Sequence, residues 1–319
     1  MVSANRGWEP LRSAWQRALY GPCGLYRHDR PAQHFRTSVH ASGLFARAIH
    51  AVVRDRGLTS VVDHGAGSGE LLRQLAALDP DLRLLGVDVL PRPADLSAGI
   101  AWRNGLPDHV DGLLLANELL DNVPCDIVEL DASGDLRSVE IHAGDEALRL
   151  GPPVTAPVRA WVDRWWPLQR PGERAEVGLA RDEVWASACA RLDGGTALAI
   201  DYGHVRDHRP PAGTLASYRA GRQTPLRLDG RHDVTAHVAM DSVAASVSGE
   251  LAFQHDALRE LGLTARRPPL RLATTDPAAY LRLLSHAGEV AELTASPGLG
   301  DFYWLLTGSM STDTPGSPL

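Results

Sequence analysis

A glycine-rich turn between an apolar strand and a helix is the feature that most constrains this chain. Residues 58–62 favour a β-strand, residues 63–69 hold three alternating glycines, and residues 70–78 have the composition of a helix. Glycine lets a backbone approach a ligand closely, and the first turn of a helix offers unpaired N–H groups. The order of strand, glycine loop and helix therefore predicts an α/β protein that binds a ligand at this loop.

The chemistry of the loop narrows the choice of ligand. Asp88 lies nineteen residues beyond Gly69, at the end of the next apolar run. An acidic side chain at such a position can accept hydrogen bonds from ribose hydroxyls. A dinucleotide fingerprint would put its third glycine where this chain has Glu70. Asp63 would attract the positive end of a zwitterion, so the loop favours S-adenosylmethionine over a dinucleotide. A tight turn that binds nothing is the alternative, and the spaced Asp88 argues against it.

The absence of lysine excludes several classes of enzyme. All 32 basic residues of the chain are arginines. A Schiff-base enzyme, a pyridoxal-phosphate enzyme and a P-loop nucleotidase each need a lysine amine. The net charge of -7 gives no reason to expect a nucleic-acid partner. Arginine-only usage beside abundant Ala, Gly and Pro is typical of a GC-rich bacterial genome.

Neither a metal site nor a membrane segment is expected. Cys23, Cys125 and Cys189 form no C-x-x-C pair, which argues against a disulfide framework and a zinc site. His204 and His208 have a spacing that metals sometimes use, but no third ligand is evident. Residues 1–9 lack an apolar signal core, and no apolar run approaches the roughly 18 residues of a membrane span. We therefore expect a cytoplasmic protein.

Alternating strands and helices predict the sheet type. Apolar runs that read as buried strands occur at 58–62, 82–87, 112–116 and 196–200, with a final strand at 302–306. Helices are expected at 8–20, 44–53, 161–166 and 183–192, the last capped by Gly194 and Gly195. This alternation is typical of a parallel α/β sheet.

The remaining segments define the predicted organisation. Residues 127–140 favour strands, and residues 203–236 read as a loop rich in arginine, glycine and proline. The expected parts are an N-terminal helical segment (1–56), a ligand-binding core (57–124 and 183–308), an inserted accessory region (125–182) and a disordered tail (309–319).

Four further groups of motifs accompany the glycine loop and extend over most of the chain. They are the segments 18–20, 24–26 and 35–38, the run N-E-L-L-D-N-V-P at 117–124, D-Y-G at 201–203, and the elements at 213–219 and 233–238. Together they resemble class I S-adenosylmethionine-dependent methyltransferases. More specifically, they resemble the MidA family, which includes the mitochondrial complex I assembly-factor arginine methyltransferase.

The resemblance implies a fold and a cofactor. The fold would be a class I, Rossmann-like, mostly parallel seven-stranded sheet with helices on both faces, preceded by N-terminal helices and carrying an accessory lid. Residues 102–106 would flank the adenine. The cofactor would be S-adenosylmethionine, held by Asp63, Gly65, Ala66, Gly67, Gly69, Asp88 and Asn117.

Carboxylates are the candidate acceptor-binding groups. An arginine acceptor needs carboxylates to orient its planar guanidinium. Glu118 and Asp121 follow the fourth strand, and open α/β sheets bind ligands at the carboxyl ends of their strands. We expect them to line the junction of cofactor and acceptor, with Asp201 and Tyr202 beside them. Helix capping is the competing role for Asp121 and Asp201.

Two further residues are weaker candidates. Glu176 is another carboxylate that could contact the acceptor. His237 could act as a general base, although a histidine that only makes hydrogen bonds is the commoner case.

The leading prediction for the function is methylation of a protein, and the arginine side chain is the first acceptor to consider. A homodimer is compatible with the sequence. The sequence departs from the family pattern at His34, Val39, His40 and Ala239. These departures leave open a factor that binds the cofactor without catalysis. A small-molecule methyltransferase also stays open, because fold alone does not set the acceptor. Glu70 and the missing lysine disfavour a nicotinamide oxidoreductase.

Overall fold

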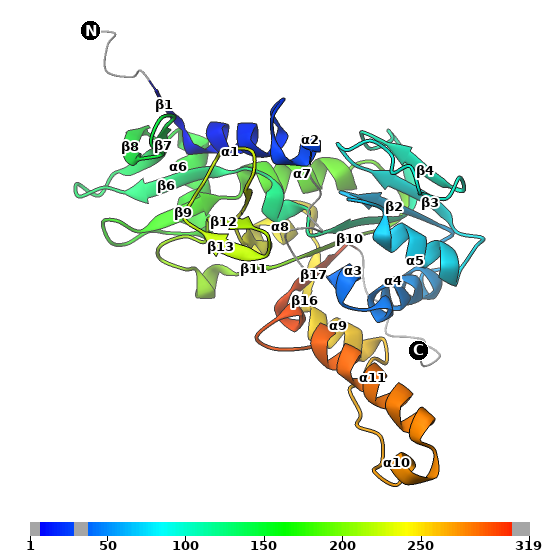
Figure 1. Ribbon diagram of the computed structural model, residues 1–319. Coiled ribbons are helices and arrows are strands. Elements are labelled where there is room, and N and C mark those ends of the chain that lie inside the picture. Colours follow the sequence, from blue (N-terminus) through cyan, green and yellow to red (C-terminus); the bar gives the residue numbers. More distant parts are fainter. Residues whose placement is uncertain (1–6, 29–37, 308–319) are drawn as a thin grey trace. The chain divides into compact units, whose positions relative to one another are not determined.

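A computed structural model describes residues 7–28 and 38–307 of the chain. The expected tail at 309–319, His34 and most of the motif at 35–38 lie outside the described residues. The described residues form two compact units (Figure 1). Unit 1 comprises residues 7–28, 118–190 and 201–249, and unit 2 comprises residues 38–117, 191–200 and 250–307.

Unit 2 is built on a mixed sheet. Its strands, in sheet order, are β16 (Glu250–Phe253), β17 (Tyr303–Leu306), β10 (Leu192–Asp201), β5 (Val110–Asn117), β2 (Ser60–His64), β3 (Arg83–Val87) and β4 (Ile100–Arg103). The run from β10 to β4 is parallel throughout, whereas β16 is antiparallel to β17. The α/β class is therefore confirmed, with a mixed rather than a plainly parallel sheet.

The helices of unit 2 follow from apolar periodicity. They are α3 (Ser38–Ala41), α4 (Gly43–Asp55), α5 (Glu70–Leu78), α9 (Gln254–Glu260), α10 (Leu272–Thr275) and α11 (Pro277–Leu293), with a short 3-10 turn η4 (Leu299–Asp301). Ser42 caps α4 by accepting a hydrogen bond from the N–H of Leu44 at 3.0 Å. Helices α4 and α5 lie side by side (Figure 1), and their apolar side chains pack into one hydrophobic core. The helix expected at 44–53 is confirmed.

The predicted end of one helix is wrong. Helix α7 covers Leu179–Cys189, so the helix predicted at 183–192 begins and ends earlier. Gly194 and Gly195 are residues of β10 and cap nothing. Gly195 is paired with Gly112 of β5, and a Cβ at Gly195 would lie 2.0 Å from the Gly112 carbonyl oxygen. Close strand pairing, rather than a helix end, therefore explains these glycines.

Unit 1 contains an antiparallel sheet. Its order is β1 (Trp8–Pro10), β7 (Leu136–His142), β6 (Asp126–Leu130) and β9 (Arg174–Val177), with β8 (Leu148–Pro153) also paired to β7. The helices of the unit are α1 (Leu11–Tyr20), α2 (Leu25–His28), α6 (Ala156–Trp165), α7 and α8 (Met240–Val247), with 3-10 turns η2 (Leu120–Asn122) and η3 (Arg206–His208).

Two helix starts in unit 1 differ from expectation. The helix predicted at 8–20 begins at Leu11, because Trp8–Pro10 pairs with β7 as a strand. The helix predicted at 161–166 begins at Ala156, because Pro157 is tolerated in a first turn, where its missing N–H costs no hydrogen bond.

The segment expected to be a loop at 203–236 contains strands. It holds β11 (Gly203–His204), β12 (Ala216–Arg219), β13 (Arg222–Thr224) and β14 (Asp233–Thr235), and β15 (Val238–Ala239) follows. Strand β12 pairs with both β13 and β14, and β11 pairs with β15. Such short strands give no alternation long enough to detect in a sequence. Across residues 7–28 and 38–307, no helix has both the length and the apolar character needed to cross a membrane.

Candidate functional site

The glycine loop of unit 2 has the backbone that its sequence predicts. Strand β2 ends at His64 and α5 begins at Glu70. Between them Gly65, Gly67 and Gly69 have φ angles of 84°, 57° and 77°. Side chains other than glycine rarely adopt these angles, so the loop needs glycine at these positions.

Asp88 is joined to this loop by hydrogen bonds. Its Oδ2 accepts from the N–H of Gly67 at 2.8 Å, and its Oδ1 accepts from the N–H of Leu90 at 2.8 Å. The N–H groups of Gly65 and Ala66 donate to the Val87 carbonyl at 2.8 and 3.2 Å. The structure thus brings the carboxylate after β3 to the glycines after β2. Leu90, which the sequence analysis missed, belongs to the same turn.

Negative charge surrounds the loop. Burial, together with the charges of Asp88 and Glu70, raises the pKa of Asp63 to about 7. The Oε2 of Glu70 accepts from the N–H of Ser68 at 3.1 Å, inside the loop. An acidic surrounding favours a cationic ligand and opposes a pyrophosphate. The residues present therefore fit S-adenosylmethionine, whose sulfonium and ammonium groups are positive.

Trp102 lies beside the last glycine of the loop. A Cβ at Gly69 would be 3.0 Å from Leu96 and 3.5 Å from Trp102. The indole N–H of Trp102 donates to the Leu90 carbonyl at 3.1 Å, which fixes the ring. This part of the expected adenine segment at 102–106 is therefore next to the loop, whereas Leu96 is a neighbour that the sequence analysis missed. Asn117 is the last residue of β5, the strand adjacent to β2.

Asp121 is the centre of a buried network in unit 1. Its Oδ2 accepts from the Tyr202 hydroxyl at 2.5 Å and from the Thr235 hydroxyl at 2.7 Å. Its Oδ1 accepts from the Asn122 amide at 2.9 Å. Burial raises the pKa of Asp121, and the bonds from Tyr202 and Thr235 oppose that rise. The structure thus brings Asp121 and Tyr202 together, as the sequence predicts.

Asp201 caps a turn in the same network. Its Oδ2 accepts from the N–H groups of Leu120 and Asp121 at 2.9 and 3.2 Å, at the start of η2. Burial raises the pKa of Asp201 well above its usual range, and the charges of Asp121 and Glu118 add to that rise. The capping geometry expected as the competing role is therefore present for this carboxylate.

Glu118 has an unusual backbone. It directly follows β5 and has a φ of 52°, in the left-handed region that side chains other than glycine seldom adopt. Its carbonyl accepts a hydrogen bond from the Asn122 amide at 3.3 Å. Strained residues of this kind gather at functional sites, where the surroundings maintain the strain.

Arg181 stabilises the unit 1 network, although the sequence analysis missed it. It is 1% exposed, and it donates to the carbonyls of Val123, His237 and Asp121 at 3.1, 2.7 and 2.9 Å. An arginine in the first turn of a helix gives no signal that its partners are carbonyls far along the chain.

His237 is an exposed residue in contact with the network. Its ring lies 5.0 Å from the Tyr202 ring and 6.3 Å from the His204 ring. Although the residue is exposed as a whole, the neighbouring side chains displace water from part of the imidazole. This desolvation lowers the pKa of His237, and the charge of Arg181 lowers it further, so the neutral form is favoured.

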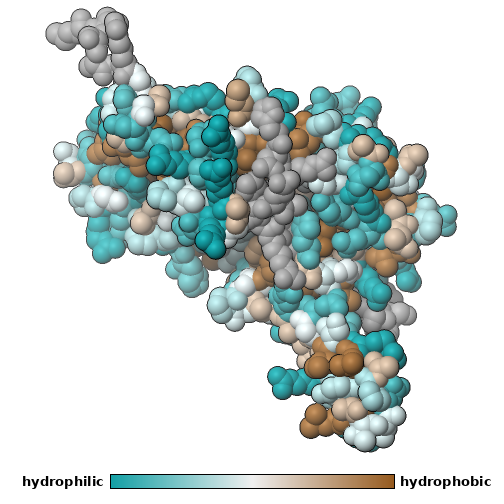
Figure 2. All heavy atoms as spheres, in the orientation of Figure 1, coloured by the Kyte–Doolittle hydropathy of each residue, from teal (hydrophilic) through white to brown (hydrophobic). Residues whose placement is uncertain are grey.

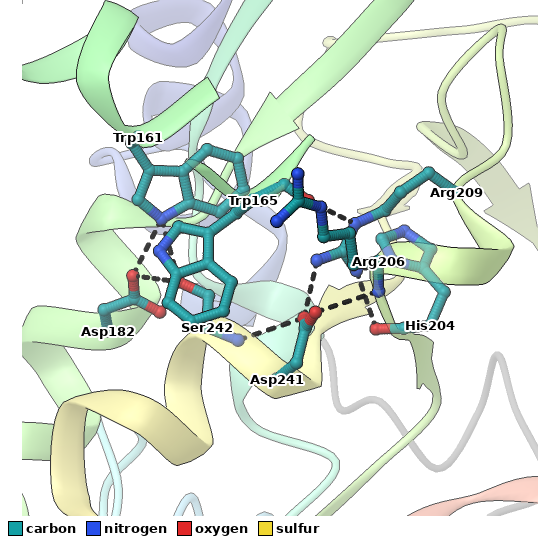
Figure 3. Close-up of polar contacts among 8 residues, drawn as sticks. All are labelled: Trp161, Trp165, Asp182, His204, Arg206, Arg209, Asp241 and Ser242. Carbon is teal, nitrogen blue, oxygen red and sulfur yellow. Dashed lines mark hydrogen bonds and ion pairs between the residues drawn. The ribbon is translucent and has the colours of Figure 1, made fainter. Parts of the chain in front are cut away.

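A second polar cluster positions His204 (Figure 3). Arg209 donates to the Nδ1 and the carbonyl of His204 at 2.6 and 2.8 Å, and it forms an ion pair with Asp241 at 2.5 Å. Burial, followed by the charge of Arg209, lowers the pKa of His204 to about 3. The Arg209 side chain, only 6% exposed, is therefore a structural group within the segment that the sequence suggested was an arginine-rich loop.

Glu176 occupies a structural position. Its Oε1 accepts from the N–H groups of Thr214 and Leu215 at 2.6 and 3.1 Å. It therefore joins β9 to the segment before β12. Among residues 7–28 and 38–307, no group of three His, Cys, Asp or Glu side chains is arranged to hold a metal ion.

Comparison with known proteins identifies the family. The family described as "Putative S-adenosyl-L-methionine-dependent methyltransferase" matches residues 71–256, more than half of the 319-residue chain. Among curated proteins, the sequence comparison found no match.

Two solved structures are similar over nearly the whole chain. One is a COG1565 superfamily member from Burkholderia thailandensis bound to S-adenosyl-homocysteine, with 26% identity, a TM-score of 0.78, and coverage of 100% of this chain and 91% of that one. The other is a native COG1565 superfamily protein from Burkholderia thailandensis, with 26% identity, a TM-score of 0.76, and coverage of 97% and 89%.

The family match confirms S-adenosylmethionine as the cofactor expected from the glycine loop. It agrees with the acidic surroundings of Asp63 and with the contact between Asp88 and Gly67. The chain belongs to this family of S-adenosylmethionine-dependent methyltransferases.

Proposed function

We propose that this protein methylates the arginine side chain of a protein, as the MidA-like motifs suggest. The observation that carries the proposal is Glu118, a carboxylate with a strained backbone directly after β5. Its carbonyl accepts a hydrogen bond from the Asn122 amide of η2 at 3.3 Å, and Asp201 caps the start of that same turn. A planar guanidinium is the acceptor group that a carboxylate binds with two parallel hydrogen bonds.

The cofactor supplies an electrophilic methyl group, and the remaining tasks fall to the chain. The acceptor nitrogen must be oriented and must lose a proton as it forms its bond to carbon. We assign orientation to Glu118 and the uptake of the proton to neutral His237. Asp121, Asp201 and Tyr202 support Glu118 through the buried network. We also propose a bacterial cytoplasm as the location, since the cofactor is a cytoplasmic metabolite.

Transfer of labelled methyl groups tests the proposal. The purified protein is incubated with radiolabelled S-adenosylmethionine and a bacterial lysate, and the labelled proteins are hydrolysed to amino acids. We expect methylarginine from the wild type, none from Gly67→Val, and a loss of about a hundredfold from Glu118→Gln, as for removal of one catalytic contact. Glu183→Gln, an exposed change on α7, is the matched control and should transfer normally.

Each contrary outcome points to a different function. Label in small molecules alone would replace the protein acceptor with a metabolite. Tight binding of S-adenosylhomocysteine without transfer to any fraction would favour a cofactor-binding assembly factor, and the arginine proposal would fail.

A further inference from the structure

An arm extends from the body of unit 2. We define the arm as residues 264–286, which include α10 and the first half of α11. Figure 1 shows α10 and this half of α11 leading away from the sheet of unit 2. The second half of α11 is anchored, because Ala287, Val290 and Leu293 are buried in the unit. The arm is therefore a continuation of a core helix, and it presents a preformed surface.

The arm has the composition of a buried helix but is exposed. Seven of the ten residues at 278–287 are apolar, and of these ten only Ala287 is buried. The exposed fractions of Leu270, Leu281, Leu283 and Leu284 are 79%, 64%, 46% and 40%. Figure 2 shows hydrophobic, brown side chains at the end of the arm. A helix that is apolar on all sides is normally covered by other parts of a protein.

The arm is also basic. It contains four arginines (266, 267, 271 and 282) and one acid, Asp276, so its net charge is +3. Since the whole chain has a net charge of -7, the rest of the chain carries -10. A partner that covers the arm should therefore combine apolar and acidic groups.

Unit 2 itself contains a groove of that chemistry. The groove measures about 450 Å³ between β16, β17 and α9, and its lining includes Leu251, Phe253, Tyr303, Asp256, Glu260 and Arg259. Arg259 forms an ion pair with Asp256 at 2.6 Å, so the two carboxylates and one arginine give the lining a net charge of -1. Phe253 is 38% exposed and its ring lies 4.8 Å from that of Tyr303. The groove therefore offers a partly exposed aromatic floor and, at Glu260, a carboxylate outside the Arg259–Asp256 ion pair, which is complementary to leucines interspersed with arginines.

We propose that the arm binds the groove of a second copy of this chain, in a two-fold symmetric dimer with two reciprocal arm–groove contacts. In such a dimer each apolar arm is covered, and each arm with its net charge of +3 meets a groove whose net charge is -1. Direct pairing of two arms is disfavoured, because both have a net positive charge. A membrane surface fits less well, since Leu281 and Leu283 are about 200° apart around the helix, whereas an interfacial helix has a single apolar face.

Molar mass in solution tests the dimer. Light scattering after size exclusion should give twice the 34.4 kDa of one chain at micromolar concentration, and added salt should weaken the dimer. The double variant Leu281→Asp/Leu284→Asp alters both arm–groove contacts and should be monomeric at the same concentration, a weakening of about a hundredfold or more. The matched control is Leu148→Asp/Leu150→Asp, which changes two exposed leucines of β8 and should leave the dimer intact.

Mixing two defective variants tests the reciprocal contact. The arm variant keeps its groove, and a groove variant, Phe253→Ser with Glu260→Arg, keeps its arm. Each should be monomeric alone, whereas their mixture should form a heterodimer with one intact contact. Binding of S-adenosylhomocysteine by every variant, measured by calorimetry, shows that each is folded.

Several results would overturn the proposal. They are a monomeric wild type at every concentration, a dimer that survives in the arm variant, and a mixture that stays monomeric. Binding of the monomeric wild type to vesicles of anionic phospholipid would assign the arm to a lipid surface instead. None of these outcomes depends on which molecule accepts the methyl group.

Discussion

Asp63 carries the charge that most directly controls the cofactor loop. Burial raises its pKa to about 7, so near neutrality half of the ligand-free molecules hold a proton there. A cationic ligand favours the ionised form, and binding below this pKa must therefore release the proton. Because the folded pKa is raised, the ligand-free protein also loses stability as the pH increases from the unfolded value of 3.8 towards 7.

We therefore expect the affinity for S-adenosylhomocysteine to depend on pH. Below about pH 7 the affinity should fall by up to tenfold for each pH unit, and above it the affinity should be constant. Calorimetric titrations at several pH values give the slope. Asp63→Asn should bind more weakly and with little slope, and an unchanged slope in this variant would assign the pH dependence to another group.

Gly67 tests whether the loop backbone itself is needed. Gly67→Val places a β-branched residue at a backbone φ of 57°, and this strain should lower the stability by about 1–3 kcal/mol. It should also displace the N–H group of residue 67, which donates a hydrogen bond to Asp88. Gly57→Val is the matched control, because Gly57 has a φ of 63° and open space around its Cβ position. Both variants should be destabilised similarly, but only Gly67→Val should lose S-adenosylhomocysteine binding. Equal binding losses in the two would show that strain alone explains the effect.

The sequence predicts a contact between two residues when the order of strands along the chain brings those residues together. The contact between Asp88 and Gly67 could be predicted, because adjacent parallel strands bring their carboxyl ends to one edge of the sheet. The position of Arg181 could not, because its three carbonyl partners come from segments that only the tertiary structure brings together.

Among the elements, α7 joins three parts of unit 1 through Arg181. Arg181→Met keeps an aliphatic side chain but leaves the carbonyls of Asp121, Val123 and His237 without this donor. A buried carbonyl that loses its charged donor has neither this partner nor water to bind. The free energy of unfolding should therefore fall by about 3 kcal/mol. Urea denaturation measures it.

The control for this variant is Arg159→Met, at an exposed position of α6. Its stability should change by less than about 0.5 kcal/mol. Similar losses in the two variants would mean that Arg181 acts through its general charge and not through its hydrogen bonds.

Elements were predictable in proportion to their length and apolar regularity. The helix at 44–53 was predicted because its apolar face repeats over several turns. The strands β11 to β15 were not, because each has four residues or fewer, too short to show alternation. The pairing of Gly195 with Gly112 is a contact between strands distant in sequence, and local reasoning interpreted its glycines as a helix end.

The whole molecule consists of two compact units, and the cofactor loop belongs to one of them. Hydrogen exchange should therefore respond unevenly to S-adenosylhomocysteine. We expect added protection at residues 63–69 and 88–90, and little change in β6, β7 and β8 of unit 1. Mass spectrometry of peptides measures both. Equal protection throughout unit 1 would indicate that binding stabilises the two units as one cooperative structure.

The order of segments along the chain has a consequence for synthesis. Strand β5 pairs with β2 on one side and with β10 on the other, but residues 118–190 of unit 1 separate β5 from β10 in the chain. While the ribosome makes those residues, the apolar strand β5 has an unpaired edge in the nascent protein. Unpaired edges recruit other chains, so Leu113–Leu115, which are buried in the folded protein, form a site of aggregation risk in the nascent chain until β10 emerges.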